Sequence, residues 1–308
     1  MFVKKIFIFF VLFLILNNFA KSQDIFIVAK VDKEIITNID IEIEKNYLLL
    51  LNDKLNKISK NEFFKLAKNS LIREIIKKKE IKKSFKKPNK EFKDKITKRF
   101  YNKFGFENKN DFINFLKTKN INFENLKEKL IVEAFWNQLI FIKYNNKIRI
   151  DESSIKNDVI KYFNSRDKKY EFNLSEIIID IDNDINLKKN EILKYVKEFG
   201  FKVAANKYSK SDTSKYGGEI GWIKSSRLTK SIQDHISNIK IGETTEPIQT
   251  SNGYLFLKLN DKREIKEEID IEKELKQQIE FEKNRQLNQF SLIYYKKVKK
   301  NTNIYESK

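Results

Sequence analysis

Apolar residues follow two different periods along the chain, and the period changes near residue 170. Before that point they recur three or four positions apart, which is the spacing of one face of a helix, most clearly at residues 63–75 and 131–142. Near the start, apolar residues at 25–31 and 34–36 flank a two-residue turn and predict a small hairpin. The first half of the chain is therefore expected to be a hairpin followed by helices.

Residues that cap helices precede these helical patterns. Thr37 and Ser59 are each followed three positions later by an acidic residue, which is close to the sequence of a capping box. Asn108 and Asn122 precede two further helical patterns, the second of which runs to about residue 144. Asp151 precedes another that runs to about residue 165. We expect helices to begin at these five positions.

The middle of the chain has a different character. Apolar residues at 172–179 predict a strand, and a helical pattern covers 187–199. Five of the seven glycines lie between 217 and 253, as expected for the turns of a compact mixed α/β domain. From residue 264 to about 299 the pattern is charged and helical again. The predicted fold class is therefore α+β, mainly helical with one inserted α/β domain.

The start of the chain predicts a cleaved signal peptide. Two lysines precede an unbroken apolar run at 6–16, and the small residues Ala20 and Ser22 place cleavage before Gln23. The run is shorter than the ~20 residues that a membrane-spanning helix needs. The expected product is an exported chain, and an uncleaved N-terminal anchor is the alternative.

Two residue types are almost absent, and their absence excludes several kinds of chemistry. The chain has no Cys, which excludes disulfides, thiol nucleophiles and thiolate metal sites. His235 is its single histidine, which excludes zinc sites with several histidines and paired-His acid–base chemistry. The acidic run at 180–184 lacks the glycine and the terminal glutamate of a calcium loop. We expect neither a metal nor a cofactor.

The net charge of +20 has more than one interpretation. Lys, Asn, Ile and Phe are abundant, and AT-rich codons encode all four, so nucleotide composition accounts for much of the lysine. Because an exported protein seldom meets nucleic acid, no nucleic-acid partner is expected. Basic residues are densest at 77–103. This segment is either a solvated helical face or a surface that attracts acidic polypeptides and, weakly, an anionic membrane.

Four ordered motifs resemble the parvulin family of peptidyl-prolyl isomerases. They are the strand at 172–179, Tyr-Ser at 208–209 with Gly-Gly-Glu-Ile-Gly-Trp at 217–222, the Gly-to-Pro-Ile element at 242–248 and the segment at 251–259. The order of hairpin, helices, parvulin domain and charged terminal helix is similar to that of the SurA-type periplasmic chaperones. Those proteins have two parvulin domains, whereas this chain has room for one.

The resemblance implies a division of the chain. The expected parts are a signal peptide at 1–22, an N-terminal helical domain at 23–168, a parvulin-like domain at 169–263 and a C-terminal helix at 264–308 that packs on the N-terminal domain.

The resemblance also implies where an isomerase site would lie. Parvulins combine an apolar pocket with a polar network of two His and a central Cys or Asp. In this sequence the first His position falls at Glu176, the second at Leu255 and the central position at Ser211, with Asp212 next to it. Leu255 cannot donate a hydrogen bond, and an ionised Glu176 only accepts. The catalytic residues are therefore unknown, and whether the chain is an enzyme stays open.

The apolar pocket keeps its character. Its family positions fall at Leu228 and Ile232, and we expect these two residues, with Leu255 and Trp222, to contact peptide. The alternative for Trp222 is a place in the core. His235 lies in a helical stretch and is expected to be solvated, and Ser211 has no base that would make it a nucleophile.

The resemblance implies a periplasmic chaperone that binds unfolded or proline-containing polypeptides, with outer-membrane β-barrel precursors as the expected clients. Prolyl isomerisation is expected to be weak or absent. Two alternatives stay open. One is an active peptidyl-prolyl cis-trans isomerase that tolerates the loss of both His residues, and the other is a basic protein that binds the surface of anionic lipid.

Overall fold

The computed structural model describes residues 24–85, 89–164, 169–181, 184–250, 253–265 and 270–307. The expected signal peptide at 1–22 lies outside these residues and stays a prediction. Within the described ranges, no helix combines the length and the apolar character that crossing a membrane requires.

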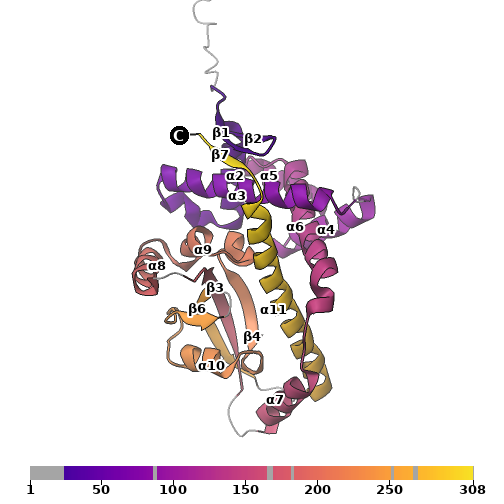
Figure 1. The fold of residues 1–308 in the computed structure, drawn as a ribbon, viewed down its shortest axis with the longest axis vertical. Coiled ribbons are helices and arrows are strands. Elements are labelled where there is room, and N and C mark those ends of the chain that lie inside the picture. Colours follow the sequence, from indigo (N-terminus) through magenta and orange to yellow (C-terminus); the bar gives the residue numbers. More distant parts are fainter. Residues whose placement is uncertain are drawn as a thin grey trace, which may run out of the picture.

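The first strands form a hairpin, as predicted. β1 (Ile27–Val31) pairs antiparallel with β2 (Glu34–Thr37), and Asp32 in the turn adopts a φ of 53°. β1 also pairs with β7 (Ile304–Glu306), a strand that the sequence patterns did not predict. The beginning and the end of the described chain therefore meet in one sheet of order β2-β1-β7 (Figure 1).

A polar side chain caps each of the predicted helix starts. Thr37 forms a reciprocal capping box with Asp40, and Ser59, Asn108, Asn122 and Asp151 each accept a hydrogen bond from a backbone amide of the following turn. The helices are α2 (Asn38–Leu51), α3 (Lys60–Lys82), α4 (Lys90–Lys103), α5 (Lys109–Thr118), α6 (Phe123–Tyr144) and α7 (Glu152–Asn164).

The middle of the chain forms an antiparallel sheet of order β4-β3-β6-β5. Ile177 and Phe256 lie on the face that α8 and α9 cover, whereas Leu174 and Leu257 lie on the face that α10 covers. This arrangement confirms the predicted class, helices with one inserted α/β unit. Its elements are β3 (Tyr170–Ile179), α8 (Ile185–Phe199), α9 (Phe201–Tyr208), β4 (Glu219–Lys224), α10 (Lys230–Ser237), β5 (Ile248–Thr250) and β6 (Gly253–Glu264).

The inserted unit and the helical region share an apolar core. Fully buried residues of the helices, such as Ile41 and Ile76, belong to the same continuous cluster as Ile177 of β3. A side-chain hydrogen bond of 2.6 Å between Asn52 and Asn206 crosses the same contact. The inserted unit is therefore docked on the helices in this structure.

The long helix α11 (Ile271–Lys300) runs beside α7, α6 and α3 (Figure 1). The predicted start at residue 264 is wrong, because β6 continues to pair with β3 as far as Glu264 opposite Tyr170. Near its C-terminal end, α11 buries Tyr294 against Trp136 of α6, with ring centroids 5.6 Å apart. The helix therefore packs on the N-terminal helices and contributes to their core.

Candidate peptide-binding site

Two of the three family positions touch each other. Glu176 lies on β3, and Ser211 caps the short 3-10 helix η3 (Asp212–Tyr216). The hydroxyl of Ser211 donates to Glu176 Oε1 at 2.7 Å, and Thr213 Oγ1 lies 2.9 Å from the same oxygen. The sequence placed Glu176 and Ser211 in one site, and the structure brings them together; Thr213 was not predicted.

A glycine fixes the backbone at this point. Gly218 has a φ of +77°, and a Cβ at this position would lie 2.2 Å from the carbonyl oxygen of Glu176. The Glu176 amide donates to the Gly218 carbonyl at 2.8 Å. Only glycine allows the two backbones to approach so closely, so the double-glycine motif holds Glu176 beside η3.

Among the described residues, no cation pairs with the Glu176 carboxyl. Burial raises its pKa, and the hydrogen bonds from Ser211 and Thr213 offset that rise only in part. Each hydroxyl has a single proton, and both oxygens lie within hydrogen-bonding distance of the carboxyl. While Glu176 is ionised, the hydroxyl protons of Ser211 and Thr213 are therefore directed to this carboxyl and not to a bound peptide.

Leu228, Ile232 and Leu255 pack against one apolar cluster, and we call these three residues the apolar patch. They are half-buried and lie over the sheet face that carries Leu257. Gln233 fixes the connection between η4 (Ser225–Arg227) and α10, because its amide donates to the carbonyls of Ser225 and Leu228 at 2.8 Å each. The structure thus brings together three of the four predicted peptide-contacting residues.

Trp222 lies apart from the apolar patch. It neighbours Ile223 on β4, and successive side chains of a strand point to opposite faces, so Trp222 points away from the cluster that contains Ile223. Trp222 is 37% exposed, and the guanidinium of Arg263 lies 4.2 Å from its ring centroid. This exposure does not fit the core alternative, and the peptide-contact role of Trp222 stays a prediction.

The remaining candidates take no part in the site. His235 Nδ1 lies 2.7 Å from the carbonyl of Ser231, one turn earlier on α10. In the part of the chain that the structure describes, no group of three acidic or His side chains could hold a metal ion. Two residues of the acidic run, Asp182 and Asn183, lie outside the described residues.

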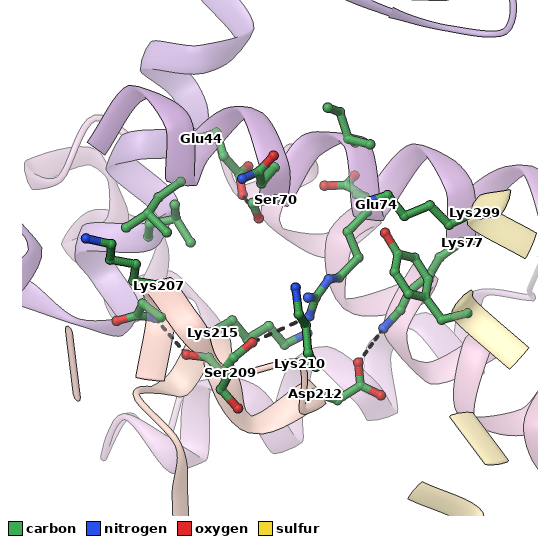
Figure 2. A pocket seen from close by; sticks show the side chains of 18 of the residues that line it. Glu44, Ser70, Glu74, Lys77, Lys207, Ser209, Lys210, Asp212, Lys215 and Lys299 are labelled. Carbon is green, nitrogen blue, oxygen red and sulfur yellow. Dashed lines mark hydrogen bonds and ion pairs between the residues drawn. The ribbon is translucent and has the colours of Figure 1, made fainter. Parts of the chain in front are cut away.

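Asp212 does not join Glu176 but points to the helical region. Lys77 Nζ of α3 lies 2.9 Å from Asp212 Oδ1 and 3.0 Å from Glu133 of α6, and Lys215 Nζ lies 3.0 Å from the other oxygen of Glu133. We call these four residues the charged seam (Figure 2 shows the Lys77–Asp212 pair). Ser291 of α11 donates to Asp212 at 2.9 Å and accepts from Trp136.

The charged seam revises the interpretation of the basic segment at 77–103. Lys77 is only 1% exposed, so it is not part of a solvated face. Burial alone would raise the pKa of the Glu133 carboxyl, but Lys215 and Lys77 hold it well below its usual range. The pKa of Asp212 is lowered against its burial by Lys77. The seam therefore holds ionised groups.

A second buried ion cluster lies beside the charged seam. Lys129 of α6 pairs with both Glu44 of α2 and Glu74 of α3, and the Ser70 hydroxyl donates to Glu44 at 2.5 Å. Burial raises the pKa of Glu44 in spite of Lys129. No sequence motif indicates either cluster. The available signal was charged residues such as Lys77 at the helical spacing of Phe63, Ala67 and Ile81 on α3.

Comparison with known proteins gives matches to one family. Residues 180–261 match the family described as Rotamase: PPIC-type PPIASE domain. The chain is 26% identical over 154 residues to the chaperone SurA of Pseudomonas putida, covering 46% of this chain and 36% of that protein. It is 28% identical over 126 residues to the chaperone SurA of Pseudomonas aeruginosa, covering 38% and 30%. The alignments thus span about a third of the length of these curated relatives.

Among solved structures, one of two SurA-like chaperones of Campylobacter jejuni is similar to this chain at 18% sequence identity. That comparison covers 92% of this chain and 99% of the other, with a TM-score of 0.38.

Proposed function

We propose that this chain, which belongs to the SurA-type parvulin family, is a periplasmic chaperone that holds unfolded outer-membrane protein precursors on the apolar patch and isomerises prolyl bonds weakly or not at all. One observation carries the proposal. Leu228, Ile232 and Leu255 pack, half-buried, against one apolar cluster, while the carboxyl of Glu176 engages the hydroxyls of Ser211 and Thr213.

Binding and catalysis make different demands on such a site. Rotation about a prolyl bond faces a barrier of about 18–20 kcal/mol, and an enzyme lowers it with hydrogen bonds that are stronger to the twisted amide than to the planar one. Leu255 has no such group, and the protons of Ser211 and Thr213 are directed to Glu176. Apolar contact stabilises a bound segment whether its amide is planar or twisted, so it gives affinity without acceleration.

Outer-membrane β-barrel precursors suit a surface of this kind. Their strands alternate apolar and polar side chains, and before insertion the apolar side chains are exposed to water. Burying apolar surface contributes roughly 25 cal/mol per Å². A half-buried patch of three aliphatic side chains can therefore hold such segments reversibly without ATP.

The test measures two activities of one preparation. The purified chain is expected to suppress the aggregation of an unfolded β-barrel precursor while leaving the isomerisation rate of a proline peptide close to the uncatalysed rate. Leu228→Ser should weaken the suppression, and Ile241→Ser, an exposed apolar residue outside the cluster, should leave it unchanged. Isomerisation that accelerates in proportion to protein concentration and disappears in Leu228→Ser would refute the proposal.

One observation favours an active isomerase as the second candidate. Because burial raises the pKa of Glu176, a larger fraction of this carboxyl is protonated in mildly acidic solution than for an exposed glutamate. A protonated carboxyl can donate a hydrogen bond. This candidate therefore requires an isomerisation rate that rises as the pH falls and that Glu176→Gln alters. A rate that does not change with pH would exclude this role for Glu176.

A further inference from the structure

A cavity of about 700 Å³ lies between the helical region and the inserted unit. Side chains of α2 and α3 line one wall, the segment at 206–215 lines another, and α11 contributes residues near its C-terminal end (Figure 2). Its carboxylates are largely occupied, since Glu44, Glu74 and Glu133 each pair with a lysine of the cavity wall. The charged side chains of the cavity that remain available to a ligand are therefore mostly cations.

Several cations of the cavity wall have no carboxylate partner. Among the described residues, neither Lys210 nor Lys299 has an acidic group within ion-pairing distance. Arg73 approaches the Ser214 hydroxyl at 3.4 Å and lies 5.5 Å from the ring centroid of Tyr295. Lys296 pairs with Asp180. Four cations thus converge on a region that supplies one carboxylate of its own.

The lowered pKa of Lys210 is consistent with this excess of cations. Partial burial lowers the pKa of its ammonium, Asp180 offsets part of that effect, and Lys299, Arg73 and Lys296 lower it further. Each of these cations therefore opposes the charge on Lys210. An anion bound among them would relieve that repulsion.

An apolar hollow adjoins the cations. A pocket of about 350 Å³ shares Lys210, Lys296, Leu292 and Asp180 with the larger cavity, and Asp180 is paired with Lys296. Its other wall is apolar and includes Ile178 of β3 and Ile293 of α11, the latter 50% exposed. Pockets of this volume are at the small end of those that hold organic ligands, and the space is suited to one large side chain.

We propose that this cavity is a second polypeptide-binding site, which recognises a carboxylate next to a large apolar side chain of a client. The carboxylate lies among Arg73, Lys210 and Lys299, and the apolar side chain occupies the hollow beside Ile178 and Ile293. The inference rests on the proposed chaperone function and adds an acidic, apolar class of segment to the clients. A side-chain carboxylate and a free C-terminus have the same chemistry here.

Fluorescence anisotropy of a labelled peptide with one Asp-Phe pair in a Gly-Ser background tests the site. The intact chain should bind this peptide more tightly than peptides in which Asn replaces Asp or Ser replaces Phe. Lys210→Gln combined with Lys299→Gln should weaken binding about tenfold, because charge-assisted contacts are lost. Ile293→Ser should weaken binding of the Phe peptide and leave the Ser peptide unchanged.

The matched control has the same change in net charge. Lys276→Gln combined with Lys297→Gln removes two exposed lysines of α11 that do not line the cavity, and it should leave binding unchanged. Circular dichroism verifies that each variant is folded. Peptides with a free or an amidated C-terminus identify the source of the carboxylate, and loss of binding on removing either carboxylate supports the site.

Two results would overturn the inference. One is equal binding of the Asp and Asn peptides with both termini amidated, together with no effect of the free C-terminus. The other is equal weakening by the cavity variant and the control variant, which would indicate diffuse attraction. The aggregation assay separates this failure from failure of the proposed function. If the intact chain suppresses aggregation of a precursor but does not bind the peptide, only this second site is refuted. If it does not suppress aggregation, the proposed chaperone function is refuted.

Discussion

The short helix η3 faces two regions with opposite electrostatics. Ser211 and Thr213 lie against Glu176 at the apolar patch, whereas Asp212 and Lys215 lie in the charged seam. At the patch a half-buried carboxyl meets only hydroxyls, and its pKa rises. In the seam half-buried carboxyls meet two ammonium groups, and their pKa falls. Through Ser211 and Thr213, η3 binds the Glu176 carboxyl. Through Asp212 and Lys215, it holds the inserted unit against the helical region.

The largest expected effect compares the two tryptophans. Trp136 is fully buried against Tyr294 and donates to Ser291 at 2.8 Å, whereas Trp222 is 37% exposed on β4. Trp136→Ala should lower the free energy of unfolding by about 3–5 kcal/mol, the usual range for a large aromatic in a core. Trp222→Ala should cost about 1 kcal/mol or less. Urea denaturation followed by circular dichroism measures both. Similar losses would mean that α11 does not complete the helical core.

The next effect concerns the charged seam. Lys77→Met leaves the half-buried carboxylates of Glu133 and Asp212 with Lys215 as their remaining cation, and should cost about 2 kcal/mol at neutral pH, less than for a fully buried pair. Lys79→Met on the same helix breaks only an exposed pair with Asp32 and should cost about 1 kcal/mol or less.

The pH dependence gives the sign of the seam's contribution. The folded-state pKa of Glu133 and of Asp212 is lowered, so their contribution to stability is present above the unfolded-state pKa of about 4 and is lost as the pH falls below it. The deficit of Lys77→Met relative to the parent should therefore shrink in acid. A deficit that is the same at every pH would show that lost packing, not lost ion pairing, explains it.

Local patterns were enough for much of the fold. Thr37, Ser59 and Asn122 mark helix starts because a cap depends only on the next few residues. The strand β7 was missed because its three residues gain a role only by pairing with β1, at the other end of the chain. The start of α11 was placed too early because the charged residues at the end of β6 still pair with β3, as far as Glu264 opposite Tyr170.

The candidate site shows the same limit. Leu228, Ile232 and Leu255 could be placed together because family motifs carry their positions, and the structure gathers them in one cluster. The Lys77–Asp212 pair joins residues 135 positions apart, and neither residue belongs to a motif that names the other. Ion pairs between units follow from docking, and docking depends on surfaces that a one-dimensional pattern does not describe.

A smaller effect should distinguish the apolar patch from the rest of the surface. Ile232 is half-buried in the patch, and Ile241 is 57% exposed outside it. Ile232→Ser should weaken the binding of an unfolded precursor about tenfold, because one large apolar contact is lost. Ile241→Ser should change the dissociation constant less than twofold. Equal effects of the two changes would mean that clients are held by scattered apolar residues and not by the patch.

The smallest expected effect concerns Glu176, whose contribution to stability should change with pH in the direction opposite to that of Glu133 and Asp212. Glu176→Gln keeps an oxygen to accept from Ser211 and Thr213 but removes the ionisation that burial opposes. Because the folded-state pKa of Glu176 is raised, its contribution to stability is fully present below the unfolded-state pKa of about 4 and is lost as the pH rises through the folded-state value. The variant should therefore match the parent near pH 3 and exceed its free energy of unfolding near pH 7, as urea denaturation at the two pH values would measure. If Glu176→Gln is instead less stable at neutral pH, the hydroxyls stabilise an ionised carboxylate, and the contrast between patch and seam is smaller than the pKa shifts indicate.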